Sequence, residues 1–269
     1  MNKLHFYKYH GAGNDFIVVD GRTQTSNLSQ KEIQSLCNRR FGIGADGLMI
    51  LDHSPDYDFS MRYYNADGKE GTMCGNGGRC IVAFAAQEGK RDYVFGAIDG
   101  THHAQILYRN GGETIVCLGM NNVDEIRPTQ KEGFFLNTGS PHLVFFVTDL
   151  DRYDVSGQGS FWRGHPDFAP EGTNVNFVEI MPNGTLFVRT FERGVEAETF
   201  ACGTGVTAAV IASYVHTKQE NTPVSNGLFT QLIKTLGGDL QVSFKVAGKR
   251  FSNVQLTGPA TFVFEGDIT

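Results

Sequence analysis

The sequence predicts an α+β fold of two pseudo-symmetric domains, each a strand-rich, barrel-like sheet around one central helix. Short runs of β-branched and aromatic residues bounded by glycine recur along the chain, as is typical of strands. Strands and helices do not alternate regularly, so a parallel α/β sheet is not expected. A cysteine–glycine–polar–glycine segment at 74–77 recurs at 202–205, about half a chain length away. This duplication indicates two related halves rather than a many-unit solenoid.

Composition narrows the class of protein. The chain has 269 residues, which is enough for two modest domains with sizeable cores. A formal charge of −6 argues against a nucleic-acid or anionic-membrane partner. The first nine residues contain no apolar core of a signal peptide, and no apolar run has the length of a membrane span. Five cysteines without a C-x-x-C pair favour free thiols in a reducing cytoplasm, and their spacing matches no zinc site.

The opening of the chain predicts a strand at 5–8, a glycine turn at 11–14 and a second strand at 16–19. A capping box at 29–32, with Leu28 placed as its hydrophobic staple, then starts a helix. This helix is expected to run to Arg40 or Phe41 and to end at Gly42.

Short apolar segments continue through both halves. A polar segment with a proline at 121–128 marks the expected crossing between domains, and the polar segment 149–170 is interpreted as a surface excursion. The domains are therefore expected to comprise 1–120 with 257–269, and 121–256. Each cysteine segment leads into the central helix of its half, and the first of these helices is expected to end near Gly89. Strands are expected at 48–51, 59–64, 104–108, 114–118, 134–136, 143–147, 177–181, 186–191, 240–246, 251–256 and 261–264.

A cysteine at the start of a helix has specific chemistry. The helix dipole and unpaired backbone amides favour its thiolate, and neighbouring glycines let a carboxylate approach those amides. Two such sites acting together could hold one carboxylate and place a sulfur on each side of the adjacent carbon. One sulfur would remove the α-proton from one face while the other returns a proton to the opposite face. The pattern therefore predicts inversion at an acidic carbon.

Three other interpretations of these segments remain open. Each segment could be an ordinary helix-start turn, although matching flanks in two copies weigh against this. Cys74 and Cys202 could form a regulatory or catalytic disulfide, which is compatible with acid–base chemistry. Acyl transfer is a third possibility; it would need a histidine, for which His142 is the best candidate, and it leaves the second cysteine without a role.

The chain resembles the diaminopimelate epimerase family, cofactor-independent amino-acid epimerases of lysine and peptidoglycan-precursor synthesis. The similarity runs nearly end to end. It rests on HGAGNDF at 10–16, GIGADG at 42–47, NADG at 65–68, CGNG at 74–77, PH at 141–142, TNV at 173–175, ERG at 192–194, CGTG at 202–205 and TGPA at 257–260.

This resemblance implies roles for individual residues. Cys74 and Cys202 match the two acid–base residues, and His142 and Glu192 match residues that tune them. The backbone amides of the residues after each cysteine match the site of the reacting α-carboxylate: Gly75, Asn76, Gly203 and Thr204. Asn14 matches a position near the reacting centre. The remaining matches hold the substrate, chiefly its distal amino-acid end: Asn65, Asn174, Glu192 and Arg193.

The resemblance also implies an isomerase that interconverts LL- and meso-2,6-diaminopimelate in a cleft between the two domains. No pyridoxal phosphate, metal or nucleotide is expected, and the partner is a small amino-acid substrate in the cytoplasm. A homodimer is compatible with the resemblance. Two alternatives share the fold: a proline-type racemase or related isomerase, and a non-catalytic redox or binding protein. The pair Glu192 and Arg193 favours a substrate with two charged ends.

Three departures from the family pattern bear on substrate contacts. Many members carry glutamine where this chain has Gly47, and asparagine where it has Ser140. The segment from Glu192 to Cys202 is one residue longer than in many members. These departures concern the fine geometry of the site rather than the class of reaction.

Overall fold

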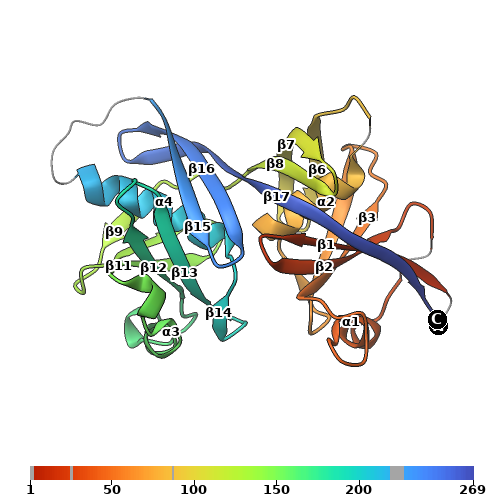
Figure 1. Ribbon diagram of the computed structural model, residues 1–269, viewed down its shortest axis with the longest axis horizontal. Coiled ribbons are helices and arrows are strands. Elements are labelled where there is room, and N and C mark those ends of the chain that lie inside the picture. The colour runs from red at the N-terminus through yellow and green to blue at the C-terminus, as the bar shows by residue number, and fades with distance from the viewer. Residues whose placement is uncertain (1–2, 25–26, 87, 219–226) are drawn as a thin grey trace. The chain divides into compact units, whose positions relative to one another are not determined.

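The computed structural model of the protein describes residues 3–24, 27–86, 88–218 and 227–269. The chain divides into two compact units (Figure 1). Unit 1 comprises Met1–Leu118 with Gly258–Thr269, and unit 2 comprises Gly119–Thr257. The long strand β17 (Arg250–Ile268) belongs to both, because its first part pairs within unit 2 and its last part within unit 1.

Unit 1 is a closed ring of strands around helix α2 (Gly75–Ala85). The ring closes because the last part of β17 pairs with both β1 and β8. The two-residue strand β5 (Glu70–Gly71) adds to β4 outside the ring. Among the described residues the ring has the order β1 (Leu4–Gly11), β2 (Asn14–Asp20), β3 (Gly47–Asp52), β4 (Phe59–Asn65), β6 (Asp92–Ala97), β7 (Gly100–Asn110), β8 (Glu113–Gly119) and β17.

Unit 2 repeats this arrangement around helix α4 (Gly203–Lys218). A bridge between Val123 and Phe251 joins the chain just before β9 to the first part of β17. The short strand β14 (Ala197–Thr199) adds to β13. The described strands follow the order β9 (Ile126–Pro128), β10 (Phe134–Asn137), β11 (Pro141–Phe146), β12 (Asn174–Ile180), β13 (Leu186–Glu192), β15 (Leu228–Thr235), β16 (Gly238–Ala247) and β17.

The two units share one topology. In unit 1, β2 pairs in parallel with β3 and β4 with β6, and in unit 2, β11 pairs with β12 and β13 with β15. A parallel pair needs a crossover. Helices α1 (Gln30–Cys37) and α2 lie in the crossovers of unit 1, and α3 (Val155–Arg163) and α4 lie in those of unit 2. The strand-rich α+β architecture with one central helix per half is confirmed.

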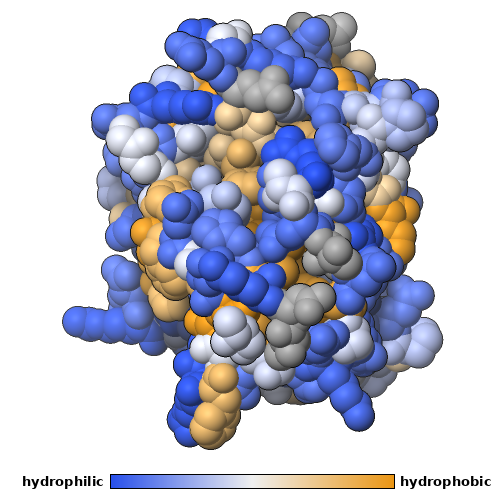
Figure 2. All heavy atoms as spheres, turned by 90° about the vertical axis from the view of Figure 1, so that its right-hand side faces the viewer, coloured by the Kyte–Doolittle hydropathy of each residue, from blue (hydrophilic) through white to orange (hydrophobic). Residues whose placement is uncertain are grey.

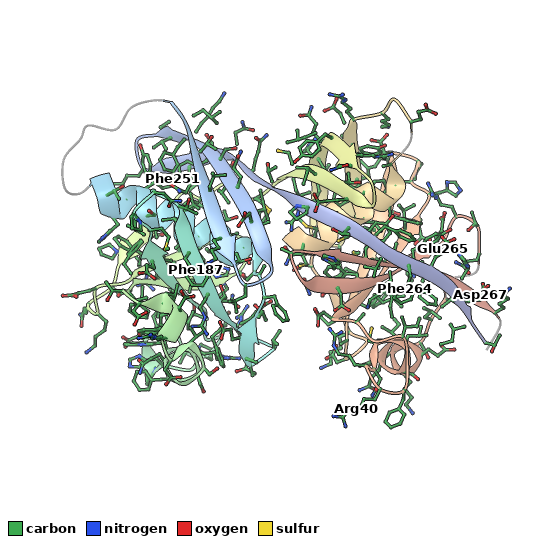
Figure 3. All side chains as sticks on the ribbon, viewed as in Figure 1. Arg40, Phe187, Phe251, Phe264, Glu265 and Asp267 are labelled. Carbon is green, nitrogen blue, oxygen red and sulfur yellow. The ribbon has the colours of Figure 1, made fainter. Side chains whose placement is uncertain are left out.

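Burial of the apolar face of each strand explains the two cores. One core cluster of unit 1 joins β1, β2, β3 and α1, and one of unit 2 joins β12, β13 and the segment around α3. Phe187 and Phe251 are each only 2% exposed in unit 2, and Figure 3 labels both. By contrast, Figure 3 shows Phe264, Glu265 and Asp267 along the last part of β17, where Phe264 is 45% exposed.

The capping box at Ser29 forms as expected, with reciprocal bonds between Ser29 and Glu32. The predicted end of that helix was wrong, however, because α1 stops at Cys37. Asn38 adopts an extended conformation, and its side-chain oxygen accepts the backbone N–H groups of Arg40 and Phe41. Local bonding by asparagine thus competes with the helix. Helix α2 similarly ends at Ala85 rather than near Gly89.

The interpretation of 149–170 as a surface excursion was incomplete, because this segment contains α3. Asp154 caps the helix by accepting the N–H of Gly157. Gly159 is buried, and a Cβ at this position would lie 2.3 Å from the Cβ of Phe191. Gly159, which weakens the helical pattern in the sequence, therefore allows close packing on β13.

The predicted strand at 261–264 is the last part of β17, which runs unbroken through Pro259. Strands β5, β6, β9, β14 and β15 were not anticipated. Among the described residues no helix is both long and apolar enough to cross a membrane. The face in Figure 2 is covered mainly by hydrophilic side chains, with apolar groups in separate patches.

Candidate active site

Both repeated cysteines occupy the N-cap of a central helix. The carbonyl of Cys74 accepts the N–H of Gly78 at 2.7 Å, and that of Cys202 accepts the N–H of Val206 at 2.9 Å. The first amides of each helix lack partners within the helix and carry its positive dipole end. Each cysteine therefore lies at the start of its helix, as its sequence context predicted, and the positive end of a helix dipole favours anions.

The first half-site joins Cys74 to two asparagines. The sulfur of Cys74 donates to Asn14 Oδ1 at 3.7 Å, and Asn76 Nδ2 donates to the same oxygen at 3.3 Å. Asn14 Nδ2 in turn donates to Asp46 Oδ2 at 2.8 Å. Asn76 is only 1% exposed, so its side chain supports the site while its backbone amide lies in the first turn of α2.

A buried arginine lies behind this half-site. Arg79 is fully buried, and it donates to Gly75 O at 3.2 Å and to Asn76 Oδ1 at 2.9 Å. Burial lowers the pKa of Arg79, while the nearby thiols of Cys80 and Cys74 oppose this shift. Arg79 was not predicted as a site residue from the sequence. The signal that could have indicated it was a lone charged residue in an apolar helical run.

An ion-pair network extends from Asn14 to the surface. Asp15 is paired with Lys8 at 2.6 Å and with Arg39 at 2.6 Å, and Arg39 also pairs with Asp46 at 2.6 Å. Burial alone would raise the pKa of Asp15, but hydrogen bonds from Arg39 and Lys8 outweigh it and hold that pKa well below 3.8. The ion pairs of Asp15 and Asp46 with Arg39 therefore anchor the base of the first half-site.

Asn65 lies at the end of β4 and is exposed, and its Oδ1 accepts from the hydroxyl of Tyr63 at 3.0 Å. Tyr63 also explains Gly47 on the neighbouring strand. A Cβ at Gly47 would lie 2.7 Å from the Tyr63 ring and 2.7 Å from the carbonyl of Tyr64. In this chain, therefore, Tyr63 fills the space where a longer residue at position 47 would begin.

The second half-site is built around a buried, neutral histidine. His142 on β11 has no exposed surface, and Asn176 on β12 donates from Nδ2 to its Nδ1 at 3.1 Å. Burial and, to a lesser extent, the charge of Arg193 hold the pKa of His142 at about 3, below its ordinary value of 6.5. Asn176 Oδ1 accepts from Thr190 at 3.0 Å. Sequence analysis did not single out Asn176 or Thr190.

Hydroxyl groups connect His142 to Cys202. His142 Nε2 lies 2.9 Å from Ser140 Oγ, which lies 3.3 Å from Thr204 Oγ1. Thr204 Oγ1 lies 3.5 Å from the sulfur of Cys202. Ser140, noted from the sequence only as a departure, is thus the link between the histidine and the cysteine.

The side chain of Asn174 forms hydrogen bonds with other protein groups in this structure. Its Nδ2 donates to Pro141 O at 2.9 Å and to Ser140 at 3.3 Å, while its Oδ1 accepts the backbone N–H of Arg193 at 2.9 Å. Asn174 is 4% exposed. Its side chain therefore fixes the start of the Arg193 turn.

Glu192 ends β13, and its Oε2 accepts from Thr199 Oγ1 at 3.1 Å. The longer connection from Glu192 to Cys202 is anchored at Glu196, which pairs with Arg163 of α3 at 2.8 Å. Glu196 has a φ of 59°, so the connection makes a left-handed turn there. This turn is thus tied to the body of unit 2.

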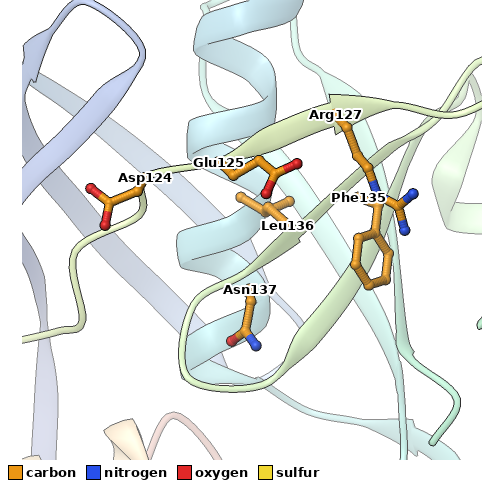
Figure 4. Close-up of a pocket in the computed structure, with 6 residues that line it drawn as sticks. All are labelled: Asp124, Glu125, Arg127, Phe135, Leu136 and Asn137. Atoms are coloured by element: carbon orange, nitrogen blue, oxygen red, sulfur yellow. The ribbon is translucent and has the colours of Figure 1, made fainter.

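The described residues contain no cluster of three or more side chains suited to hold a metal ion. A pocket of about 410 Å³ lies in unit 2, where the guanidinium of Arg127 stacks 4.7 Å from the Phe135 ring (Figure 4). None of the predicted site residues lines this pocket. Its walls are Asp124, Glu125, Arg127, Phe135, Leu136 and Asn137.

Comparison with known proteins decides the family. The model of the diaminopimelate epimerase family matches residues 6–120 and 134–263. The chain belongs to the diaminopimelate epimerase family. It is 45% identical to the diaminopimelate epimerase of Flavobacterium psychrophilum, over 98% of this chain and all of that one. It is 43% identical to that of Chlorobaculum tepidum, over 96% and 99% of the two chains.

Solved structures show the same fold at low identity. A PhzF-family phenazine biosynthesis protein of Bacillus anthracis superposes with a TM-score of 0.73 at 15% identity, with both chains fully covered. A hydroxyproline epimerase of Agrobacterium vitis superposes with a TM-score of 0.70 at 16% identity, over 99% of this chain and 92% of that one. Diaminopimelate epimerases thus share their two-barrel architecture with other proteins.

Proposed function

We propose that this protein is a diaminopimelate epimerase, an isomerase that interconverts LL- and meso-2,6-diaminopimelate by proton transfer at one α-carbon. The observation that carries the proposal is the pair of N-cap cysteines, each at the central helix of one of two barrels with the same topology. Relatives that carry this name match the chain over nearly its whole length at 43–45% identity. The products belong to lysine and peptidoglycan-precursor biosynthesis.

In the proposed reaction, Cys74 and Cys202 act on opposite faces of one α-carbon. A thiolate takes the α-proton and a thiol gives its proton to the other face, so the centre inverts without a cofactor. The backbone amides of the first helical turns would bind the α-carboxylate: Gly75, Asn76, Gly203 and Thr204. These amides stabilise the negative charge that the carbanion spreads onto the carboxylate.

The distal end of the substrate is a zwitterion and needs partners of both charges. Arg193 would bind the distal carboxylate and Glu192 the distal ammonium group. Asn14 would contact the reacting centre, and the exposed amide of Asn65 would contact the remainder of the substrate. Asn174 would act by holding the backbone of Arg193, since its side chain bonds that amide at 2.9 Å.

His142 and Glu192, the two residues proposed to tune the cysteines, act through hydrogen bonding and charge. Neutral His142 does not accept an α-proton at ordinary pH, because burial holds its pKa near 3. It orients the hydroxyl groups that lead to Cys202, and Glu192 adds a negative charge next to the same segment.

We also propose that the enzyme works in the reducing cytoplasm, where its thiols stay reduced. The exposed β17 residues Phe262, Val263 and Phe264 would suit contact with a second copy, which sedimentation would measure.

Solvent-exchange experiments test the proposal. The purified protein in deuterium oxide should incorporate deuterium at the α-carbon of diaminopimelate, measured by mass spectrometry. Cys74→Ala and Cys202→Ala should each lower net epimerisation by at least about a thousandfold, because each removes one acid–base group. Undiminished turnover in either variant would sink the two-base mechanism.

A substrate panel separates the proposed activity from that of a sister enzyme. The alternative proline-type racemase has support from the fold alone, since a hydroxyproline epimerase superposes with a TM-score of 0.70. Turnover of proline or hydroxyproline in preference to diaminopimelate would favour that alternative. Absence of any α-proton exchange under full reduction would favour a non-catalytic protein.

A further inference from the structure

The two cysteines have hydrogen-bonding partners of opposite polarity. Cys74 lies 3.7 Å from a carbonyl oxygen of Asn14, which can only accept. Cys202 lies 3.5 Å from the hydroxyl of Thr204, which can donate or accept. The groups behind each of these two partners fix the direction of its hydrogen bond with the sulfur.

In unit 1 the orientation of Asn14 is dictated from both sides. Its Nδ2 faces Asp46 Oδ2 at 2.8 Å, and an ionised carboxylate only accepts. Its Oδ1 receives Asn76 Nδ2 at 3.3 Å, because Asn76 Oδ1 is occupied by the guanidinium of Arg79 at 2.9 Å. Asn14 therefore presents an acceptor to Cys74, and an S–H group satisfies it.

In unit 2 a directed chain of bonds begins at Asn176. Its Nδ2 donates to the carbonyl of Leu143 at 3.0 Å, which fixes the orientation of the amide. The same Nδ2 faces His142 Nδ1 at 3.1 Å. Nδ1 is therefore the acceptor, and the neutral ring carries its proton on Nε2.

Ser140 continues this directed chain of hydrogen bonds. Its oxygen accepts from His142 Nε2 at 2.9 Å and from Asn174 Nδ2 at 3.3 Å. The Asn174 amide cannot be reversed, because its Nδ2 also donates to Pro141 O at 2.9 Å. Both acceptor positions of the hydroxyl are thus filled, and its single proton points to Thr204 Oγ1 at 3.3 Å.

Thr204 then accepts from Ser140 and directs its own proton at the sulfur of Cys202. A hydrogen bond received by a charged group favours the charged form. We propose that in the resting enzyme Cys202 is the thiolate base and Cys74 is the thiol acid, with Ser140 and Thr204 as positioning residues. This inference rests on the proposed epimerase function and assigns the starting roles within it.

The charged groups around Cys74 act in opposite directions. The buried cation of Arg79 favours a thiolate on Cys74, but its guanidinium donates hydrogen bonds to Gly75 O, Asn76 Oδ1 and Pro259 O. Asp46, behind Asn14, favours the thiol. The acceptor oxygen of Asn14 lies 3.7 Å from the sulfur and bonds it directly, whereas the guanidinium bonds other atoms. In the proposed assignment the direct bond prevails.

Two charged residues of opposite sign, Glu192 and Arg193, are adjacent in the chain at the end of β13. A negative charge near Cys202 would disfavour its thiolate, and a positive charge would favour it. His142 contributes no charge, because burial keeps it neutral. The bond donated by Thr204 favours the thiolate on Cys202.

The proton count follows from this assignment. The Cys202 thiolate takes the α-proton and becomes a thiol, and the electron pair of the C–H bond passes into the carbanion. The Cys74 thiol then gives its proton to the other face and becomes a thiolate. Exchange with water restores the resting distribution after the product leaves.

The test measures each thiol separately in the substrate-free protein. Iodoacetamide alkylation of the two cysteine peptides is followed by mass spectrometry across pH, and the midpoint of each rate profile reports the thiol pKa. We expect the Cys202 midpoint to lie at least one pH unit below that of Cys74. A lower midpoint for Cys74 would show that the charge of Arg79 prevails and would overturn the assignment.

Matched variants test the relay. Thr204→Val should raise the Cys202 midpoint by about one unit, a tenfold loss of thiolate at neutral pH, whereas Thr204→Ser keeps the hydroxyl and the midpoint. Ser140→Ala should raise the midpoint in the same direction. Thr138→Val is the control, because the Thr138 hydroxyl donates to the backbone carbonyl of Thr204 at 2.9 Å and lies outside the relay. Equal midpoints in Thr204→Val and Thr204→Ser would refute the positioning role.

Alkylation requires no substrate, so the inference and the proposed function can fail independently. Deuterium exchange with reversed midpoints would remove the assignment and leave the epimerase function intact. The expected midpoints without any exchange would support the assignment of protons and remove the function.

Discussion

The two half-sites stand on the same topology but differ in what lies behind the cysteine. In the parallel strand pair behind α2, Phe16 aligns with Gly47, and in the matching pair behind α4, His142 aligns with Asn174. The buried ring is therefore a phenylalanine in unit 1 and a histidine in unit 2. The duplicated scaffold thus keeps the helix and the cysteine while its supporting polar groups have diverged.

The next positions along these strands continue the contrast. A Cβ on Gly77 would lie 3.1 Å from the sulfur of Met49, whereas a Cβ on Gly205 would lie 2.4 Å from Asn176 Oδ1. The second glycine after each cysteine thus packs on an apolar neighbour in unit 1 and on an amide in unit 2. Neither position leaves room for a side chain without movement of its neighbour, which explains why both copies have glycine there.

The fifth residue after each cysteine shows the difference in charge. Arg79 donates to Gly75 O at 3.2 Å, and Thr207 donates to Gly203 O at 2.9 Å. Both residues satisfy the carbonyl of the first helical glycine, but only one carries a charge. In unit 1 the groups behind the cysteine include the charged side chains of Arg79 and Asp46, whereas in unit 2 the hydrogen-bonded chain from His142 to Cys202 runs through neutral side chains.

The largest effect should come from removing the buried charge. Arg79→Met leaves Asn76 Oδ1 and Gly75 O without their donor and should lower the free energy of unfolding by about 2–4 kcal/mol, since each buried unsatisfied group costs about 1–3 kcal/mol. Urea denaturation measures this loss. The matched Thr207→Val should cost only about 1 kcal/mol, because a single neutral bond is lost. Equal losses would contradict the distinction between the units.

Acid should affect unit 2 before unit 1. The pKa of His142 is about 3 in the folded protein and 6.5 as the ordinary value, so the unfolded chain binds a proton first as pH falls. Its stabilisation is present above pH 6.5 and is lost toward pH 3, on the order of a few kcal/mol. Protonation of Asp15, which is ion-paired in the folded protein, lowers the free energy of unfolding only near and below pH 3.8.

Hydrogen exchange at a series of pH values measures this order by following each unit separately. Between pH 6 and 4, amides in β11 and β12 should lose protection before those in β2 and β3. His142→Asn should reduce the pH dependence in unit 2. Simultaneous loss of protection in both units would contradict the prediction.

The smallest of these effects should come from the surface side of the first half-site. Asp46→Asn replaces an acceptor-only group with an amide that can present either end, so Asn14 is no longer held in one orientation. We expect kcat to fall by about tenfold, with the folding free energy changed by less than about 1 kcal/mol. Steady-state kinetics at several pH values measures this. A change in stability alone would show that Asp46 has only a structural role.

Much of the scaffold could be predicted locally. The strands at 16–19 and 186–191 and the capping box at Ser29 follow from short-range patterns, and each is present. Helix α3 and the continuation of β17 through Pro259 could not be anticipated, because packing overrode weak local signals. In the sequence, for example, Gly159 indicates a helix breaker. The structure shows that it lies in a helix and packs against Phe191.

The candidate site divides in the same way. The sequence by itself determined the duplicated cysteine segments, the family and the set of polar residues near them, because these depend on residue identity and spacing. The tertiary structure alone decided that Arg79 and Asp46 orient two amides, that His142 is neutral, and that Ser140 connects it to Thr204. The physical reason is that hydrogen-bond direction and pKa depend on neighbours from distant strands, which residue spacing along the chain does not specify.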